Sequence, residues 1–422
     1  MRALSAVSSD PRISRKTHAR AAPPRSPLQK CEGGLEAFAT GYTRYGLNAR
    51  GDGSVELREW VPAAAGLALI GDFNGWNGAS HRASRDAFGV WTLRLPAGAL
   101  PHGSRYKLQL TRHDGGKVDR LSAWTRFATV APGKMGAAYD GVHWAPPSSE
   151  RHVWRHTAPP PPAAMRIYEA HVGMATSQPR VGSYREFADN VLPRVATGGY
   201  NTLQLMAVAE HAYYASFGYH VTNFFAVSSR SGNPEELKYL IDIAHGLGIR
   251  VLLDVVHSHA SSNVDDGLAG LEAGSDGSAY LKGGAAGKHA AWGSRCFNYA
   301  AWETQRLLLS NLRFWMDEFK VDGFRFDGVT SMLYVHHGIN KAFSGSYAEY
   351  FSPETDLDAV AYLMLANDLI HSLRPGAASI AEDVSGMPTL CRPIAEGGVG
   401  FDARLASAFV LLRDFVLNLV SD

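Results

Sequence analysis

Gly323-Phe-Arg-Phe-Asp-Gly-Val329 is an apolar stretch that carries one cation and one anion. Because side chains alternate between the two faces of a strand, Arg325 and Asp327 should point to one side, and Phe324 and Phe326 to the other. A neighbouring guanidinium favours the ionised carboxylate, so we expect Arg325 to lower the pKa of Asp327, as a carboxylate nucleophile requires. The alternative is a structural Arg–Asp pair that closes a strand.

The chain on both sides of this stretch alternates between strand and helix patterns. Strands are predicted over 165–171, 202–206, 250–256, 323–329 and 378–384, with a sixth over 399–408. Helices are predicted over 184–195, 234–247 with Asn233 as cap, 304–319 and 357–373. Such repeats form a parallel sheet wrapped by helices, and a (β/α)8-type barrel is favoured at this length. With about six strand units, the α/β barrel is expected to be incomplete, with open edges.

The region before the barrel has a different pattern. Short runs over 55–60, 67–70, 90–95 and 106–110 are separated by Gly, Asn and Asp turns, which is typical of a small N-terminal β-sandwich. Four tryptophans of this region are candidates for sugar binding: Trp60, Trp76, Trp91 and Trp124. Flat aromatic faces stack on sugar rings, but a sandwich core also uses Trp, so each is a candidate for either place.

Prolines 159–162 mark the clearest domain boundary, because such a run forms a stiff extended linker. The predicted organisation is a disordered or targeting segment over 1–40, a β-sandwich over 41–150, a Pro-rich linker over 151–164 and a partial barrel over 165–422. The start is rich in Arg and Ser and poor in acidic residues, which fits an organelle transit peptide or a solvated tail. We therefore expect a cytoplasmic protein, or a plastid protein if the start is a transit peptide.

The net charge, the cysteines and the apolar runs give no support to a nucleic-acid-binding protein, a zinc-cysteine protein or a membrane protein. Forty-one basic and 40 acidic residues give a net charge of +1, which gives no support to nucleic acid or a membrane as the main partner. Cys31, Cys296 and Cys391 lack the paired spacing of a zinc site and are predicted to be free thiols. The most apolar long run, 405–420, is interrupted by charges and is too short to span a bilayer. We expect a soluble monomer.

Charged residues end three of the predicted strands, which is where barrels of this kind carry catalytic groups. Asp254 is in the third, Arg325 and Asp327 are in the fourth, and Glu382 is in the fifth. Two carboxylates from neighbouring strands, roughly 5 to 5.5 Å apart, are what retaining glycoside hydrolysis needs. Asp327 is the better nucleophile, because Arg325 neighbours it. Glu382 is the better acid/base, and burial should keep its pKa high.

His257 and His259 form an HxH pair near Asp254, which invites a zinc hypothesis. The other predicted strand ends offer no histidine, and the adjacent His336 and His337 have divergent side chains, so a metal hydrolase is disfavoured. A histidine that reaches a sugar hydroxyl explains His259 without a metal.

Several motifs, in this order along the chain, resemble those of the α-amylase clan. Their sequences are most similar to those of the eukaryotic 1,4-α-glucan (glycogen or starch) branching enzymes. They lie at 254–259, 323–332 and 381–386, with further matches at 210–219, 332–334 and 362–367. The sandwich, with Gly-Asp-Phe-Asn-Gly-Trp at 71–76, resembles the starch-binding module that precedes the barrel in branching and debranching enzymes. The resemblance covers about 41 to 408.

By this resemblance, Asp327 would form the glucosyl-enzyme ester and Glu382 would be the general acid/base. Arg325 would keep Asp327 ionised, and Asp254 would support the site. His259 would bind sugar hydroxyls and Tyr219 would stack beneath the ring being cleaved. The implied reaction breaks an α-1,4 bond and transfers the chain to a 6-hydroxyl of an α-glucan such as glycogen, amylose or amylopectin, with no cofactor.

The family's fourth motif, a His-Asp pair after the seventh strand, is absent from this sequence. The resemblance to the family ends after Ala408. We therefore expect a C-terminally truncated chain that is inactive or poorly folded when expressed as given. Two alternatives stay open: a hydrolase of the same clan, and a non-catalytic glucan-binding protein.

Overall fold

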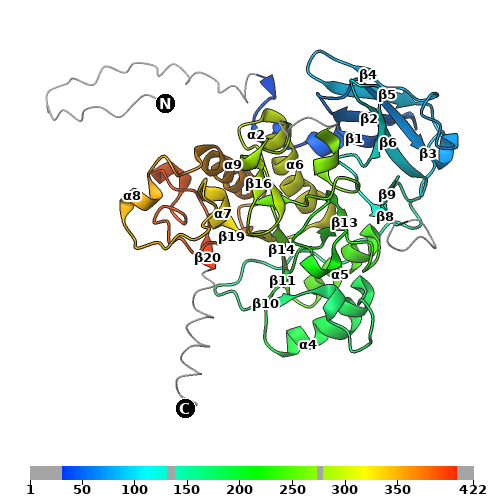
Figure 1. Ribbon diagram of the computed structural model, residues 1–422. Helices are drawn as coiled ribbons and strands as arrows, with labels where there is room; N and C mark the ends of the chain where they lie inside the picture. Colours follow the sequence, from blue (N-terminus) through cyan, green and yellow to red (C-terminus); the bar gives the residue numbers. More distant parts are fainter. Residues whose placement is uncertain (1–30, 131–137, 273–278, 406–422) are drawn as a thin grey trace, which may run out of the picture.

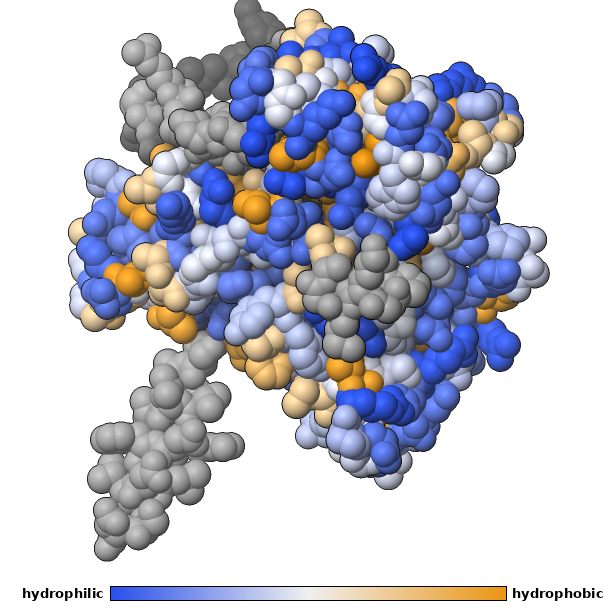
Figure 2. Space-filling view, turned by 45° about the vertical axis from the view of Figure 1, so that its right-hand side comes forward, coloured by the Kyte–Doolittle hydropathy of each residue, from blue (hydrophilic) through white to orange (hydrophobic). Residues whose placement is uncertain are grey.

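The computed structural model describes residues 31–130, 138–272 and 279–405, and every element named below lies in these ranges (Figure 1). Residues 1–30 of the segment predicted over 1–40 and the apolar run after Leu405 lie outside them, whereas residues 31–40 are described and include the buried Phe38. Within the described residues, no helix has the length and apolarity needed to cross a membrane. On the face in Figure 2 the surface is mostly hydrophilic, with hydrophobic residues in small scattered groups. Cys31, Cys296 and Cys391 are free thiols.

The first part of the chain forms two antiparallel sheets, as predicted. One has the order β1 (Gly46–Ala49), β2 (Val55–Trp60), β5 (Val90–Leu95) and β4 (Ser84–Arg85). The other has the order β3 (Gly66–Gly71), β6 (Arg105–Thr111), β9 (Asp140–Val142) and β8 (Ala128–Thr129), and β7 (Lys117–Arg120) also pairs with β6. In β2 buried residues alternate with partly buried ones, as expected when one face of a strand covers a core.

The second part contains a six-stranded sheet in which every neighbouring pair is parallel. Its order is β10 (Ile167–Ala170), β11 (Thr202–Leu205), β14 (Arg250–Val255), β18 (Gly323–Phe326), β19 (Ala378–Glu382) and β20 (Ala403–Leu405). The strands follow one another in chain order, as in a barrel. The predicted six units of a β/α sheet are confirmed, and the part of the sixth predicted strand after Leu405 lies outside the described residues.

Helices follow the strands at nearly the predicted positions. The long ones are α5 (Pro234–Gly246), α6 (Trp302–Phe319) and α9 (Leu357–Leu373). The predicted helix over 184–195 is composite, with α3 (Tyr184–Glu186), a π-helical segment (Phe187–Val191) and α4 (Leu192–Thr197). The Asn233 side chain caps α5 as predicted, since it accepts hydrogen bonds from the N–H groups of Glu235 and Glu236.

Shorter elements lie between and before the main strands and helices. They are α2 (Leu35–Phe38), α7 (Val329–Leu333), α8 (Tyr347–Tyr350), the hairpin of β12 (Ala209–Glu210) and β13 (Asn223–Val227), and a small sheet of β15 (His259–Ala260), β17 (Ser294–Cys296) and β16 (Lys288–His289). The predicted strand over 323–329 is too long, because β18 ends at Phe326 and Gly328 adopts φ 62° before α7 begins.

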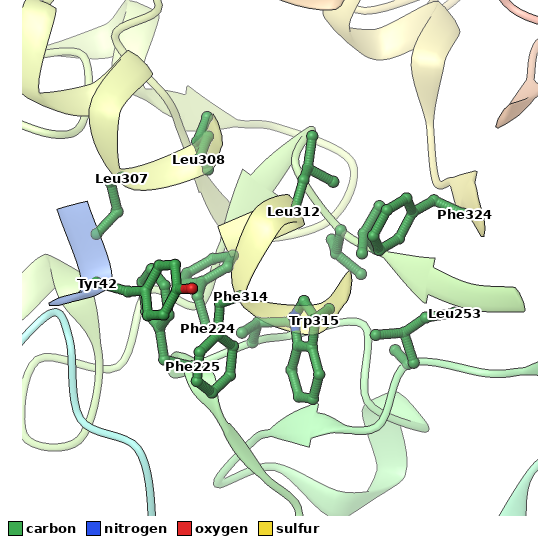
Figure 3. Packing of buried hydrophobic residues seen from close by; sticks show 14 of the residues in the cluster. Tyr42, Phe224, Phe225, Leu253, Leu307, Leu308, Leu312, Phe314, Trp315 and Phe324 are labelled. Carbon is green, nitrogen blue, oxygen red and sulfur yellow. The ribbon is translucent and has the colours of Figure 1, made fainter. Parts of the chain in front are cut away.

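Helix α6 lies at the centre of the hydrophobic core (Figure 3). Its buried side chains include Leu312, Phe314 and Trp315, which lie among residues of β13, β14 and β18. The same core cluster includes Leu57 and Leu108 of the sandwich, so the two parts of the molecule share one apolar interior. This shared core fixes the sandwich against the barrel.

Candidate active site

The parallel register brings the three charged strand ends together. Asp254 in β14 lies directly opposite Arg325 in β18. Phe326 lies opposite Ala381, the residue before Glu382 at the end of β19. Residues separated by up to 128 positions therefore meet at the carboxyl ends of three adjacent strands, the edge at which barrels carry their catalytic groups.

Arg325 contacts all three carboxylates. Its Nη1 donates to both oxygens of Asp254, at 2.7 and 2.6 Å, and to Oδ1 of Asp327 at 2.9 Å. Its Nη2 lies 2.9 Å from Oε2 of Glu382. Glu382 also accepts a hydrogen bond of 2.9 Å from the N–H of Gly328. One planar guanidinium thus sets the relative positions of three acidic side chains, a geometry that suits Arg and not Lys.

Arg325 lowers the pKa of Asp327, as expected, but other effects raise this pKa by more. Burial raises the pKa of Asp327, the nearby Asp254 charge raises it further, and Arg325 offsets only part of this. Burial also raises the pKa of Asp254, again against the effect of Arg325. The predicted direction of the Arg325 effect is therefore right, but the net pKa is not lowered, because three carboxylates share this one cation in a buried place.

A cavity of about 420 Å³ lies over these carboxylates. Its lining includes Tyr213, Ala215, Ser216, Tyr219, His220, His259, Trp292, Asp327, Gly328 and Glu382. Tyr219 donates a hydrogen bond of 2.9 Å to Asp254, and its ring lies 5.9 Å from the Arg325 guanidinium carbon. Burial, followed by the Asp254 charge, raises the pKa of Tyr219, so the phenol keeps the proton that it donates. Asp327 and Glu382 are therefore accessible from the cavity, with Tyr219 beside them.

The two histidines of the HxH pair have different surroundings. His259 lines the cavity, but its Nε2 donates to the carbonyl of Tyr219 at 2.8 Å and its Nδ1 lies 3.2 Å from the Ser258 hydroxyl. Burial lowers the pKa of His259 to about 3, so the ring is neutral. His257 lies in the core, where its nitrogens contact Tyr362 at 2.6 Å and Asn311 at 3.0 Å. The two histidines therefore do not point toward a common metal-ion site.

Across residues 31–130, 138–272 and 279–405, no group of three or more His, Cys, Asp or Glu side chains is arranged to hold a metal ion.

Two of the four candidate sugar-binding tryptophans belong to the core. Trp91 is 5% exposed and donates to the carbonyl of Val61, and Trp124 is 2% exposed and stacks against Phe225 of the barrel part at 4.9 Å. For both, the core alternative is the one observed, because a buried ring has no face open to a ligand. Trp60 and Trp76 are partly exposed and stay candidates.

Sequence reasoning missed two features of the site. Trp292 lies between the strands predicted over 250–256 and 323–329, and no periodic pattern marked it. The Gly328 N–H points at Glu382 because Gly328 turns the chain after Asp327, and the overlong predicted strand concealed that turn. The Gly at the end of Phe-Asp-Gly was the available signal, since glycine favours a positive φ.

Comparison with known families supports both parts of the molecule. Residues 44–125 match the model described as carbohydrate-binding module 48 (isoamylase N-terminal domain). Residues 204–267 match the alpha amylase catalytic domain. Curated relatives named 1,4-alpha-glucan-branching enzyme are 59% identical over 90% of this chain in Oryza sativa subsp. japonica and 60% identical over 90% in Solanum tuberosum. One in Yarrowia lipolytica is 53% identical over 93%.

Over 90% of its length, the chain is thus similar to 1,4-alpha-glucan-branching enzymes. It spans about half the length of the curated branching enzymes it matches, 47% of the rice protein, 45% of the potato protein and 58% of the Yarrowia protein. The rice branching enzyme is named as chloroplastic/amyloplastic.

Solved structures share the fold of this chain at low sequence identity. The catalytic module of the glycogen-degrading pneumococcal virulence factor SpuA has a TM-score of 0.61 at 19% identity, over 83% of this chain and 52% of that one. The GBS pullulanase SAP, solved with maltotetraose, has a TM-score of 0.58 at 19% identity, over 81% of this chain and 46% of that one. At this identity they support an α-amylase-type barrel.

Proposed function

We propose that this protein is a 1,4-α-glucan branching transferase that cleaves an α-1,4 bond and attaches the released chain to a 6-hydroxyl. The observation that carries the proposal is the Arg325 guanidinium, which holds Asp327 and Glu382 at adjoining strand ends below an open cavity. The names of relatives 50–60% identical to this chain support the same reaction.

In the first step Asp327 reacts in its ionised form, which the Arg325 guanidinium stabilises, and one of its oxygens attacks C1 of the glucose unit. Because Arg325 holds Oδ1, we assign the attack to Oδ2. The C1–O4 bond breaks as Glu382 transfers its proton to the departing O4, and an ester between Asp327 and C1 forms. Asp254 holds Arg325 through two hydrogen bonds and Tyr219 through a third, so it supports the geometry without touching C1.

In the second step, Glu382 takes the proton of a 6-hydroxyl on the acceptor glucan, and that oxygen attacks C1. The ester to Asp327 breaks and the α-1,6 bond forms, so configuration is retained over two displacements. Glu382 is protonated again and Asp327 is free. We propose that His259 helps to shape the site and that an α-glucan such as glycogen, amylose or amylopectin is the substrate.

We further propose that the protein acts as a monomer, without nucleic acid or a membrane as partner, and that it works in the cytoplasm or in a plastid. Plant relatives named as chloroplastic/amyloplastic support the second compartment.

The test uses the protein purified from its source and incubated with amylose. A branching transferase lowers the iodine absorbance without releasing reducing ends. Release of reducing ends would instead identify a hydrolase, and retention on starch with neither change would identify a glucan-binding protein.

The two carboxylates are tested in the same assay. Asp327→Asn and Glu382→Gln keep the shape of each side chain but remove the nucleophile and the proton donor. We expect each to abolish transfer while retention on starch is unchanged. Substantial residual transfer in either variant would contradict the assigned role.

A further inference from the structure

Trp292 lies in the turn between β16 and β17 and lines the cavity together with Asp327 and Glu382. The turn has a fixed relation to the site, because β17 pairs with β15 and Cys296 lies opposite His259 in that pairing. An aromatic residue that sequence patterns did not indicate therefore lies beside the proposed nucleophile.

The indole of Trp292 is packed on several sides. The His289 ring stacks on it, with centroids 3.9 Å apart and planes 13° apart. The His259 ring centroid lies 4.8 Å away. A Cβ added at Gly328 would lie 3.1 Å from Cη2 of Trp292, so the tip of the indole is close to the backbone after Asp327. Trp292 is nevertheless 38% exposed. The ring is thus held in place while part of it stays open to the cavity.

His289 contacts other aromatic rings: it stacks on Trp292, and its centroid lies 5.0 Å from that of His337. It is 1% exposed and is not part of the cavity lining. Its Nδ1 accepts a hydrogen bond of 3.2 Å from the backbone N–H of Trp292, so Nε2 carries the hydrogen, and Nε2 has no hydrogen-bond partner in the described chain. Burial lowers the pKa of His289 to about 4, so a neutral imidazole stacks on the indole at neutral pH.

We propose that Trp292 is a stacking platform for one glucose ring of the α-glucan, beside Asp327, and that His289 is a positioning residue that orients the indole. The C–H faces of a pyranose are apolar and complement the negative face of an aromatic ring. Binding cavities typically combine such aromatic walls with a few polar groups. This inference rests on the proposed function, since it takes an α-glucan as the ligand of the cavity.

The test is a 19F NMR titration of the chain, labelled with 5-fluorotryptophan, with maltoheptaose. The chain has nine tryptophans, and Trp292→Phe identifies the resonance of Trp292 by its loss. We expect this resonance to shift saturably with maltoheptaose. The Kd taken from its titration should weaken about 3- to 10-fold in His289→Ala, as the loss of one aromatic contact implies. His289→Phe keeps a flat ring at this position, so its Kd for maltoheptaose should stay within about 2-fold of that of the parent chain.

Tyr200→Ala is the matched control, because Tyr200 is 39% exposed and lies just before the amino end of β11, at the opposite end of the sheet. It should change neither the resonance nor the Kd. If the resonances of other tryptophans shift with maltoheptaose and that of Trp292 does not, the chain binds glucan but Trp292 is not a stacking platform. If no resonance shifts, glucan binding by the chain fails as well. Equal Kd values for His289→Ala and the parent chain, with equal melting temperatures, would contradict the proposal that His289 orients the indole of Trp292.

Discussion

Arg325 organises the proposed site through the shape of its side chain as well as its charge. The two nitrogens Nη1 and Nη2 reach different carboxylates, with Asp254 and Asp327 on one and Glu382 on the other. A lysine ammonium is a single point and leaves the outer carboxylates without a common partner. The cluster therefore depends on the planar fork.

We expect Arg325→Lys to lower the rate of transfer by roughly 100-fold, the scale of losing one positioned electrostatic contact in an active site. The charge is kept, so the effect tests geometry. Arg185→Lys is the control, since Arg185 makes an ion pair with Glu236 on the surface, and it should leave the rate unchanged. A rate for Arg325→Lys within a few-fold of the parent enzyme would show that charge alone suffices.

Glu59 is a buried carboxyl group in the sandwich, outside the site. It is 0% exposed and accepts a hydrogen bond from the Ser122 hydroxyl, and its Oε1 has no partner in the described chain. Burial raises its pKa to about 8 from the ordinary 4.5. The folded state therefore keeps this proton when the unfolded state has lost it, and folding stability falls as pH rises from about 4.5 toward about 8.

We expect Glu59→Gln to flatten this fall and to make the protein more stable than the parent chain at pH 9, by up to a few kcal/mol, because each pKa unit corresponds to about 1.4 kcal/mol. Urea unfolding at pH 5, 7 and 9 measures the free energy of unfolding of the variant and of the parent chain. Glu56→Gln, on the same strand and in a surface ion pair with Arg50, should keep the slope of the parent. Parallel curves for Glu59→Gln and the parent would contradict the buried-proton assignment.

Helix α5 depends on its cap. Asn233 accepts from two N–H groups of the first turn, while the Glu236 side chain accepts from the N–H of Asn233. Pro234 occupies the first helical position, where a missing N–H costs nothing.

Asn233→Ala removes the side-chain acceptor and should destabilise the protein by about 1 kcal/mol. Asn233→Asp keeps an acceptor and should cost less, which chemical denaturation of the two variants can compare. An alanine variant as stable as the aspartate variant would mean that water satisfies these N–H groups equally well.

The sandwich and the barrel part form one apolar interior. Trp124 stacks between Tyr45 at 5.1 Å and Phe225 at 4.9 Å, and so joins the two parts. Gly41 N–H also donates to the Ser310 hydroxyl of α6 at 3.0 Å.

Because Trp124 is a core residue of both parts, Trp124→Ala should destabilise the protein by about 3 to 5 kcal/mol. Calorimetry should show a single transition for the parent chain and a lower melting temperature for the variant, with Trp124→Phe between them. Two separate transitions in the parent chain would show that the parts unfold independently.

Several features were predictable because they depend on neighbours in sequence. The predicted bounds of α9 match the structure at both ends, and the Asn233 cap of α5 is confirmed, since apolar periodicity and capping are local. Asp254, Asp327 and Glu382 were predicted to meet because parallel strands align their carboxyl ends, and the register of β14, β18 and β19 confirms it.

Other features depend on what a residue meets in space, and the amino-acid order carries no direct signal for that. The raised pKa of Asp327 depends on burial and on carboxylates from two other strands, which one neighbouring arginine does not reveal. The core positions of Trp91 and Trp124 and the stacking of Trp292 on His289 likewise depend on partners across the fold. Local patterns thus determined the elements and the reacting groups, whereas packing decided their charge states and which aromatic faces stay open, because burial and electrostatics sum over all neighbours in three dimensions.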